Sequence, residues 1–138
     1  MELLSVSVGD SRLKGADLLI HSCCIEDLNP KLFQELSCGM VPLCSCLERE
    51  HINMIVSKAA TIIKTADPRM IRVLTVDGSP HCVQLHYAVQ QAKALTGSSV
   101  RVEHMVIEHG KLYRISEDTV KLSRHLSHIQ MMKEKSSV

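Results

Sequence analysis

The sequence contains very few aromatic residues, with two Tyr, one Phe and no Trp among 138 residues. Proteins that hold single-stranded nucleic acids usually stack the bases on such side chains, so their scarcity argues against that function. The formal net charge is only +1, from 16 basic and 15 acidic side chains, which gives little attraction for phosphate backbones or anionic membranes. We therefore expect no nucleic acid partner and a core built from aliphatic side chains.

Long apolar runs are also missing. No uncharged stretch is long enough to span a bilayer, and the first ten residues lack the basic segment and apolar run of a secretory signal. We expect a cytoplasmic protein that does not associate with membranes. In that reducing compartment, the six cysteines are expected to be metal ligands, redox thiols or small buried residues rather than disulfides.

The glycine-rich motifs of common nucleotide sites are absent. Neither G-x-G-x-x-G nor G-x-x-x-x-G-K-[ST] occurs in the sequence, although a dinucleotide or P-loop site would need one of them after the first buried strand. No repeat, low-complexity segment or linker divides the chain. We expect one domain over residues 1–138, in which residues from about 132 onward form a frayed tail.

Alternating strand and helix patterns run through most of the chain. A half-exposed edge strand is predicted over 4–8, and buried strands over 17–21, 40–46 and 70–76. Helices are predicted over 30–36, 48–66 and 80–96, with apolar stripes that include Leu85, Ala88 and Leu95 in the last of them. Pro42 weakens the prediction for 40–46 because proline cannot donate to a sheet ladder.

The remaining segments predict a hairpin followed by a helix. Strands over 100–107 and 111–115 are joined at His109 and Gly110, and a last helix from about Ser116 carries Leu122, Leu126 and Ile129 at helical spacing. Together the patterns predict an α/β fold, a three-layer open sheet that is mostly parallel with an antiparallel edge hairpin.

Five of the six cysteines follow predicted parallel strands. Because ligands of open α/β sheets bind outside the carboxyl ends of the strands, these thiols are expected to share one edge of the sheet. The set consists of Cys23, Cys24, Cys44, Cys46 and Cys82.

Metal binding is the leading hypothesis for this edge. Thiolates suit an iron–sulfur cluster or zinc, and His21 could add a nitrogen ligand to Cys23, Cys24, Cys44, Cys46 and Cys82. The chain lacks paired C-x-x-C motifs, so the ligands would come from separate loops. The predicted function is electron transfer, or delivery of a metal centre to a larger redox protein complex. Redox dithiols at Cys23-Cys24 or Cys44-x-Cys46, and cysteines that serve only as core residues, remain open alternatives.

A second hypothesis centres on the loop before the helix at 80–96. Asp77, Gly78 and Ser79 could hold a small anionic ligand at the helix N-terminus, where the dipole also favours a Cys82 thiolate beside His81. The chain would then be a small enzyme or ligand-binding module with structural cysteines. A tight strand-to-helix connection with no ligand is the simpler alternative, and a homo-oligomer is left open.

The other histidines give weaker evidence for a functional site. His125 and His128 lie one helical turn apart and could share a metal, but a solvated helix face is favoured for them. His51, His86, His104 and His109 show no partner in the sequence.

Overall fold

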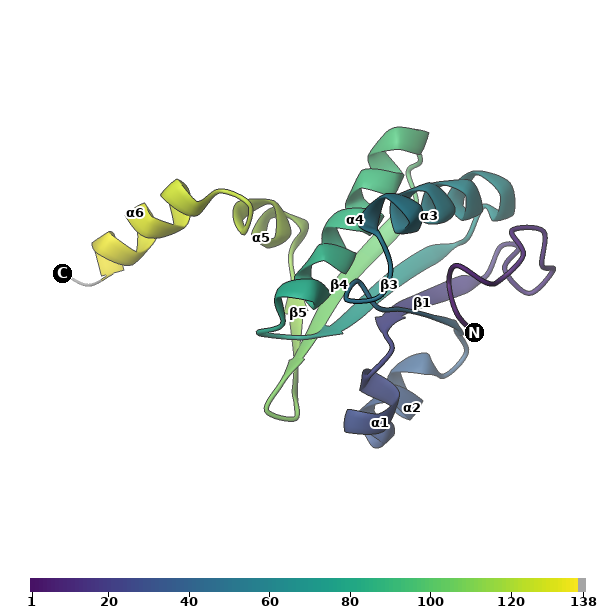
Figure 1. Ribbon diagram of the computed structural model, residues 1–138, viewed down its shortest axis with the longest axis horizontal. Coiled ribbons are helices and arrows are strands. Elements are labelled where there is room, and N and C mark those ends of the chain that lie inside the picture. The colour runs from purple at the N-terminus through teal and green to yellow at the C-terminus, as the bar shows by residue number, and fades with distance from the viewer. Residues whose placement is uncertain (137–138) are drawn as a thin grey trace.

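A computed structural model describes residues 1–136 and contains a five-stranded sheet with helices on both faces (Figure 1). The strand order is β2-β1-β3-β4-β5. The strands are β1 (Asp17–Ser22), β2 (Val41–Ser45), β3 (Met70–Val76), β4 (Arg101–Glu108) and β5 (Lys111–Ile115). All neighbouring pairs are parallel except β4 and β5, which form an antiparallel hairpin at one edge. The predicted fold class is confirmed.

Helices α3 (Ile52–Ala66) and α4 (Pro80–Thr96) pack side by side on one face of the sheet. Their apolar stripes bury residues such as Ile55, Ile62 and Leu85 against Val73 of β3. The short helices α1 (Ile25–Leu28) and α2 (Pro30–Ser37) cover the opposite face, where Leu19, Leu74 and Met105 form a second cluster. The core is aliphatic on both faces, as the composition predicts.

The chain changes direction within the sheet between β1 and β3. From β1 it moves outward to β2 and then returns to place β3 on the other side of β1. In an open α/β sheet, such a reversal leaves a crevice at the carboxyl ends of the two central strands, because their connections leave toward opposite sides. Pro42 is tolerated because β2 is the last strand of the sheet on its side.

The N-terminal segment differs from its prediction. Residues 4–8 form turns rather than a strand, and Leu3 and Val6 are buried, three residues apart. The backbone N–H groups of Ser5 and Val6 both donate to the Glu2 carbonyl, which closes the turn. The bridge that this segment makes with the sheet joins Glu2 to Cys44. The alternation of Leu4, Val6 and Val8 therefore misled the prediction.

Three helical predictions also need correction. Helix α3 begins at Ile52 rather than Glu48, because Arg49 and Glu50 donate to the Cys46 carbonyl in a separate turn. Leu95, expected in the core, is 65% exposed at the end of α4. The predicted last helix is divided into α5 (Glu117–Leu122) and α6 (Leu126–Ser136).

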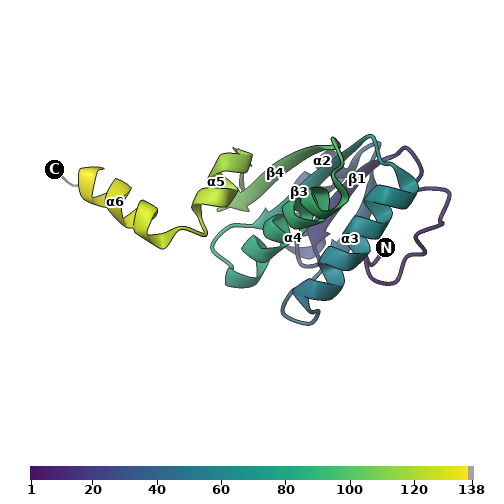
Figure 2. The same cartoon turned by 90° about the horizontal axis from the view of Figure 1, so that it is seen from above.

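Helix α6 projects away from the sheet (Figures 1 and 2). None of its residues is buried, and Leu126, expected on an apolar stripe, is 78% exposed. Residues 132–136, expected in a frayed tail, are helical, and the rest of that predicted tail lies outside the described residues. Among the helices of residues 1–136, none is long and apolar enough to cross a membrane.

Candidate functional site

A cavity of about 340 Å³ lies where the loops after β1, β2 and β3 meet. Thirteen residues line it, drawn from these three loops, from the last residues of β1 and β2, and from α1 and the first two turns of α4. They include four of the five cysteines that were predicted to share this edge, namely Cys23, Cys24, Cys46 and Cys82. The position agrees with the crevice that the strand reversal between β1 and β3 creates.

The loop after β2 places the guanidinium group of Arg49 at the cavity. Glu50 fixes this loop, since its Oε1 accepts hydrogen bonds from the Cys46 backbone N–H at 2.8 Å and from the Ser45 hydroxyl at 3.2 Å. The resulting turn carries Arg49 across toward β1, where its Nη2 donates to Cys23 Sγ at 3.4 Å. Arg49 is exposed and lines the cavity, so a bound ligand could reach its guanidinium.

The loop after β3 brings the N-terminus of α4 to the same cavity. Gly78 has a φ of +90°, a conformation that favours glycine. It is followed by Ser79, whose hydroxyl accepts from the Cys82 N–H at 3.3 Å, and by Pro80 at the first helical position. This is the helix start that the sequence predicts. Ser79, His81 and Cys82 line the cavity, whereas Asp77 and Gly78 line a neighbouring one.

Cys23 lies in an environment that disfavours its thiolate form. Burial, followed by interaction with the Cys44 side chain, raises its pKa well above the usual range, and Arg49 offsets this only in part. Cys23 is therefore a neutral thiol at physiological pH. Cys44 is a neighbour of Cys23 but is not among the residues that line the cavity.

The thiols do not form a metal-binding set as they are placed. Within residues 1–136, no group of three or more His, Cys, Asp or Glu side chains is arranged to hold a metal ion. The guanidinium of Arg49 already contacts the Cys23 thiol. The prediction of an iron–sulfur cluster or zinc therefore gains no support from the described residues.

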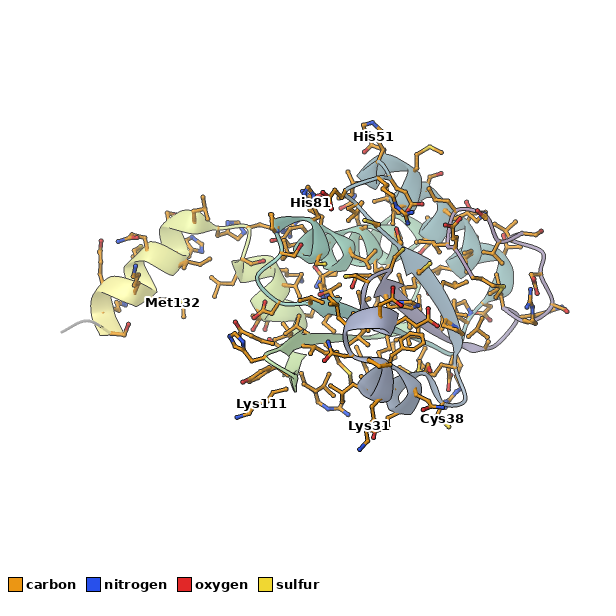
Figure 3. The ribbon with its side chains drawn as sticks, turned by 60° about the horizontal axis from the view of Figure 1, so that its bottom comes forward. Lys31, Cys38, His51, His81, Lys111 and Met132 are labelled. Carbon is orange, nitrogen blue, oxygen red and sulfur yellow. The ribbon has the colours of Figure 1, made fainter. Side chains whose placement is uncertain are left out.

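The predicted ligand His21 and the remaining cysteine, Cys38, lie away from the cavity. His21 is buried on the α2 face, where its Nδ1 contacts the Ser22 carbonyl at 2.9 Å and its ring packs edge-on against Phe33. Burial lowers the pKa of His21. Figure 3 shows Cys38, the sixth cysteine, at the end of α2 and far from His81, which lies near the start of α4. Neither His21 nor Cys38 lines the cavity.

Comparison with protein families agrees with this architecture. The family described as Rossmann-like domain matches residues 10–138. The chain belongs to this family. No curated protein and no solved structure matches it. The Rossmann-like domain of this chain has His21-Ser22-Cys23-Cys24 at the end of β1, where a dinucleotide-binding site would carry a glycine-rich turn.

Sequence reasoning missed two features of this Rossmann-like domain. Arg49 was assigned to a helix, although the charged run Glu48-Arg49-Glu50 directly after Cys46 is typical of a polar loop. His86 and His104, which showed no partner in the sequence, contact each other through their Nδ1 atoms at 2.9 Å. No spacing rule could have paired them, because one lies on α4 and the other on β4. His125 and His128 are exposed, as expected, and their rings stack at 4.9 Å.

Proposed function

We propose that this chain binds a small anionic molecule in the cavity at the carboxyl edge of the sheet. The observation that carries the proposal is that Arg49 and the N-terminal turn of α4 line one cavity. A guanidinium binds carboxylates and phosphates through two parallel N–H groups, and the dipole at the N-terminus of a helix favours a negative charge. The cavity, at about 340 Å³, has the size of a small-molecule site.

Two carboxylates narrow the class of ligand. Asp27 and Glu48 line the same cavity, and both are exposed. Carboxylates accept hydrogen bonds but repel other anions, so the ligand should also present hydroxyl or amino groups to them. We therefore propose a hydroxy or amino compound that carries a carboxylate or phosphate. His81 and Cys82 border this site and are the residues we propose for any chemistry on the ligand.

Substitution of Arg49 tests the proposal. Calorimetric titration of the protein with citrate and with inorganic phosphate should show binding of at least one of them. Arg49→Gln should weaken that binding about 10- to 100-fold, because it removes a charge-assisted contact of roughly 1.5–3 kcal/mol. The matched control is Arg101→Gln, since Arg101 lies at the start of β4 and hence at the opposite end of the parallel strands. Equal affinities for the three proteins would contradict the proposal.

Metal-dependent electron transfer is the rival proposal, and the gathering of thiols at one edge supports it. Visible absorption and metal analysis of anaerobically purified protein separate the two. Bound iron and colour would favour the rival, whereas a colourless, metal-free protein whose stability is unchanged by chelator would favour the anion site. We further propose a cytoplasmic location, which the six free cysteines support.

A further inference from the structure

Four side chains form a hydrogen-bonded chain beneath α4. Thr75 of β3 lies 2.8 Å from His86 Nε2, His86 Nδ1 lies 2.9 Å from His104 Nδ1, and His104 Nε2 lies 3.3 Å from Gln90 Nε2. Thr75 is 1% exposed and each histidine 3% exposed. The chain therefore crosses the interior from α4 through β4 and α4 again to β3.

Gln90 determines which atom donates at each step. Its Nε2 also donates to the backbone carbonyl of Glu117 at 3.4 Å, so the atom that faces His104 is the amide nitrogen rather than the oxygen. His104 Nε2 must then accept, which places the single proton of its neutral ring on Nδ1. Both rings are neutral, because burial lowers the pKa of His104 and lowers that of His86 to about 3.

The same reasoning determines which ring nitrogen of His86 carries the proton. Its Nδ1 accepts the proton of His104 Nδ1–H, so its own proton lies on Nε2 and is donated to Thr75 Oγ1. His86 cannot then act as a base toward Thr75, although the pair resembles a nucleophile beside a general base. The hydroxyl proton of Thr75 remains available, and no acceptor for it occurs in the described part of the chain.

A second cavity, of about 260 Å³, borders the loop after β3 next to this pair. Thr75 and His86 line it, together with three valines and the loop residues Asp77, Gly78 and Ser79. The lining contains no Lys or Arg, and Asp77 is its one carboxylate. A ligand here meets a buried donor, apolar walls and a negative charge.

We propose that this cavity binds a small neutral molecule through a carbonyl group that accepts the Thr75 hydroxyl proton. The histidine chain orients the hydroxyl, because the Thr75 oxygen already accepts from His86 Nε2–H. The valines contact the apolar body of the ligand, and N–H groups of the ligand donate to Asp77. Anions are excluded by Asp77, which distinguishes this site from the one beside Arg49, so either site can fail its test without the other.

Benzamide is the probe for this site, and NMR titration of the ¹⁵N-labelled protein is the measurement. Binding should be retained in Thr61→Val, whose hydroxyl donates to the Ser57 carbonyl on α3, and should weaken about tenfold in Thr75→Val. Benzoate, which has the same shape and a negative charge, should bind at least about tenfold more weakly than benzamide. If Thr75→Val does not fold, Val83→Trp takes its place in the test. Val83 lines the cavity and is partly exposed, so a Trp side chain there should fill the cavity and abolish binding.

Long-range ¹H–¹⁵N spectra of the histidine rings test the hydrogen-bond direction in the same sample. We expect the proton on Nε2 of His86 and on Nδ1 of His104. The reverse assignment, an absence of benzamide binding, equal binding by Thr75→Val, or equal affinity for benzoate would each overturn the proposal.

Discussion

At the residue scale, three buried histidines make the stability of the fold sensitive to pH. His21, His86 and His104 are all buried, and burial lowers the pKa of each. The sequence analysis proposes His21 as a metal ligand and finds no partner for His86 or His104. His86 lies next to the stripe of Leu85, Ala88 and Val89 that the helical pattern predicts, but its partner comes from β4 through tertiary packing.

This burial predicts loss of stability in mild acid. In the unfolded chain these histidines take up protons below their ordinary pKa of 6.5, whereas in the folded protein His86 stays neutral until about pH 3. Stability from this source is thus complete above pH 6.5 and falls as the pH decreases toward 3. The free energy of unfolding should fall by up to about 1.4 kcal/mol per pH unit for each such histidine.

Urea denaturation at pH 7, 6 and 5 measures this slope above the range where carboxylates titrate. His86→Gln combined with His104→Gln should flatten it. The exposed pair His125→Gln and His128→Gln should leave it unchanged. A stability that is constant from pH 7 to pH 5 in the unmodified protein would contradict the prediction.

At the element scale, the bounds of strands and helices are predicted best where the hydrophobic period and the helix caps agree. Strand β3 has the bounds predicted from its continuous apolar run, and α4 begins at Pro80 after the Ser79 cap. Prediction failed where apolar residues are not buried. Leu126 and Ile129 follow a helical period in α6, but no part of the sheet lies beneath them, and period alone cannot show whether a surface exists to cover a stripe.

Helix α6 should therefore be dispensable for folding. A chain that ends at Arg124 keeps the buried Val120 and the hydrogen bond between Tyr87 and Ser123. Its free energy of unfolding in urea should change by less than about 0.5 kcal/mol, as is usual for changes that remove no buried contact. A chain that ends at Ser116 also loses Val120 and should be destabilised by roughly 1.5–3 kcal/mol. A large loss in the longer chain would show that α6 packs against something essential.

At the scale of the whole molecule, the order of the strands determines where a ligand-binding cavity can form. The sequence predicts which residues follow each parallel strand, and four of the five cysteines placed there by this rule line one cavity. It does not predict which loop side chains face one another. Arg49 reaches Cys23 only because β2 lies beside β1 and because Glu50 holds the intervening turn. That contact is the basis on which we propose anion binding at this edge, where the positions of the cysteines alone predict metal ligation.

Mapping of the bound anion on the fold tests this account most directly. In ¹⁵N-labelled protein titrated with citrate, the account predicts that the largest shift changes occur at backbone amides of residues 23–24, 46–49, 79 and 81–82, which border the cavity. Shift changes confined to the β4–β5 hairpin or to α6, or saturation of shifts without any change in those three segments, would contradict it.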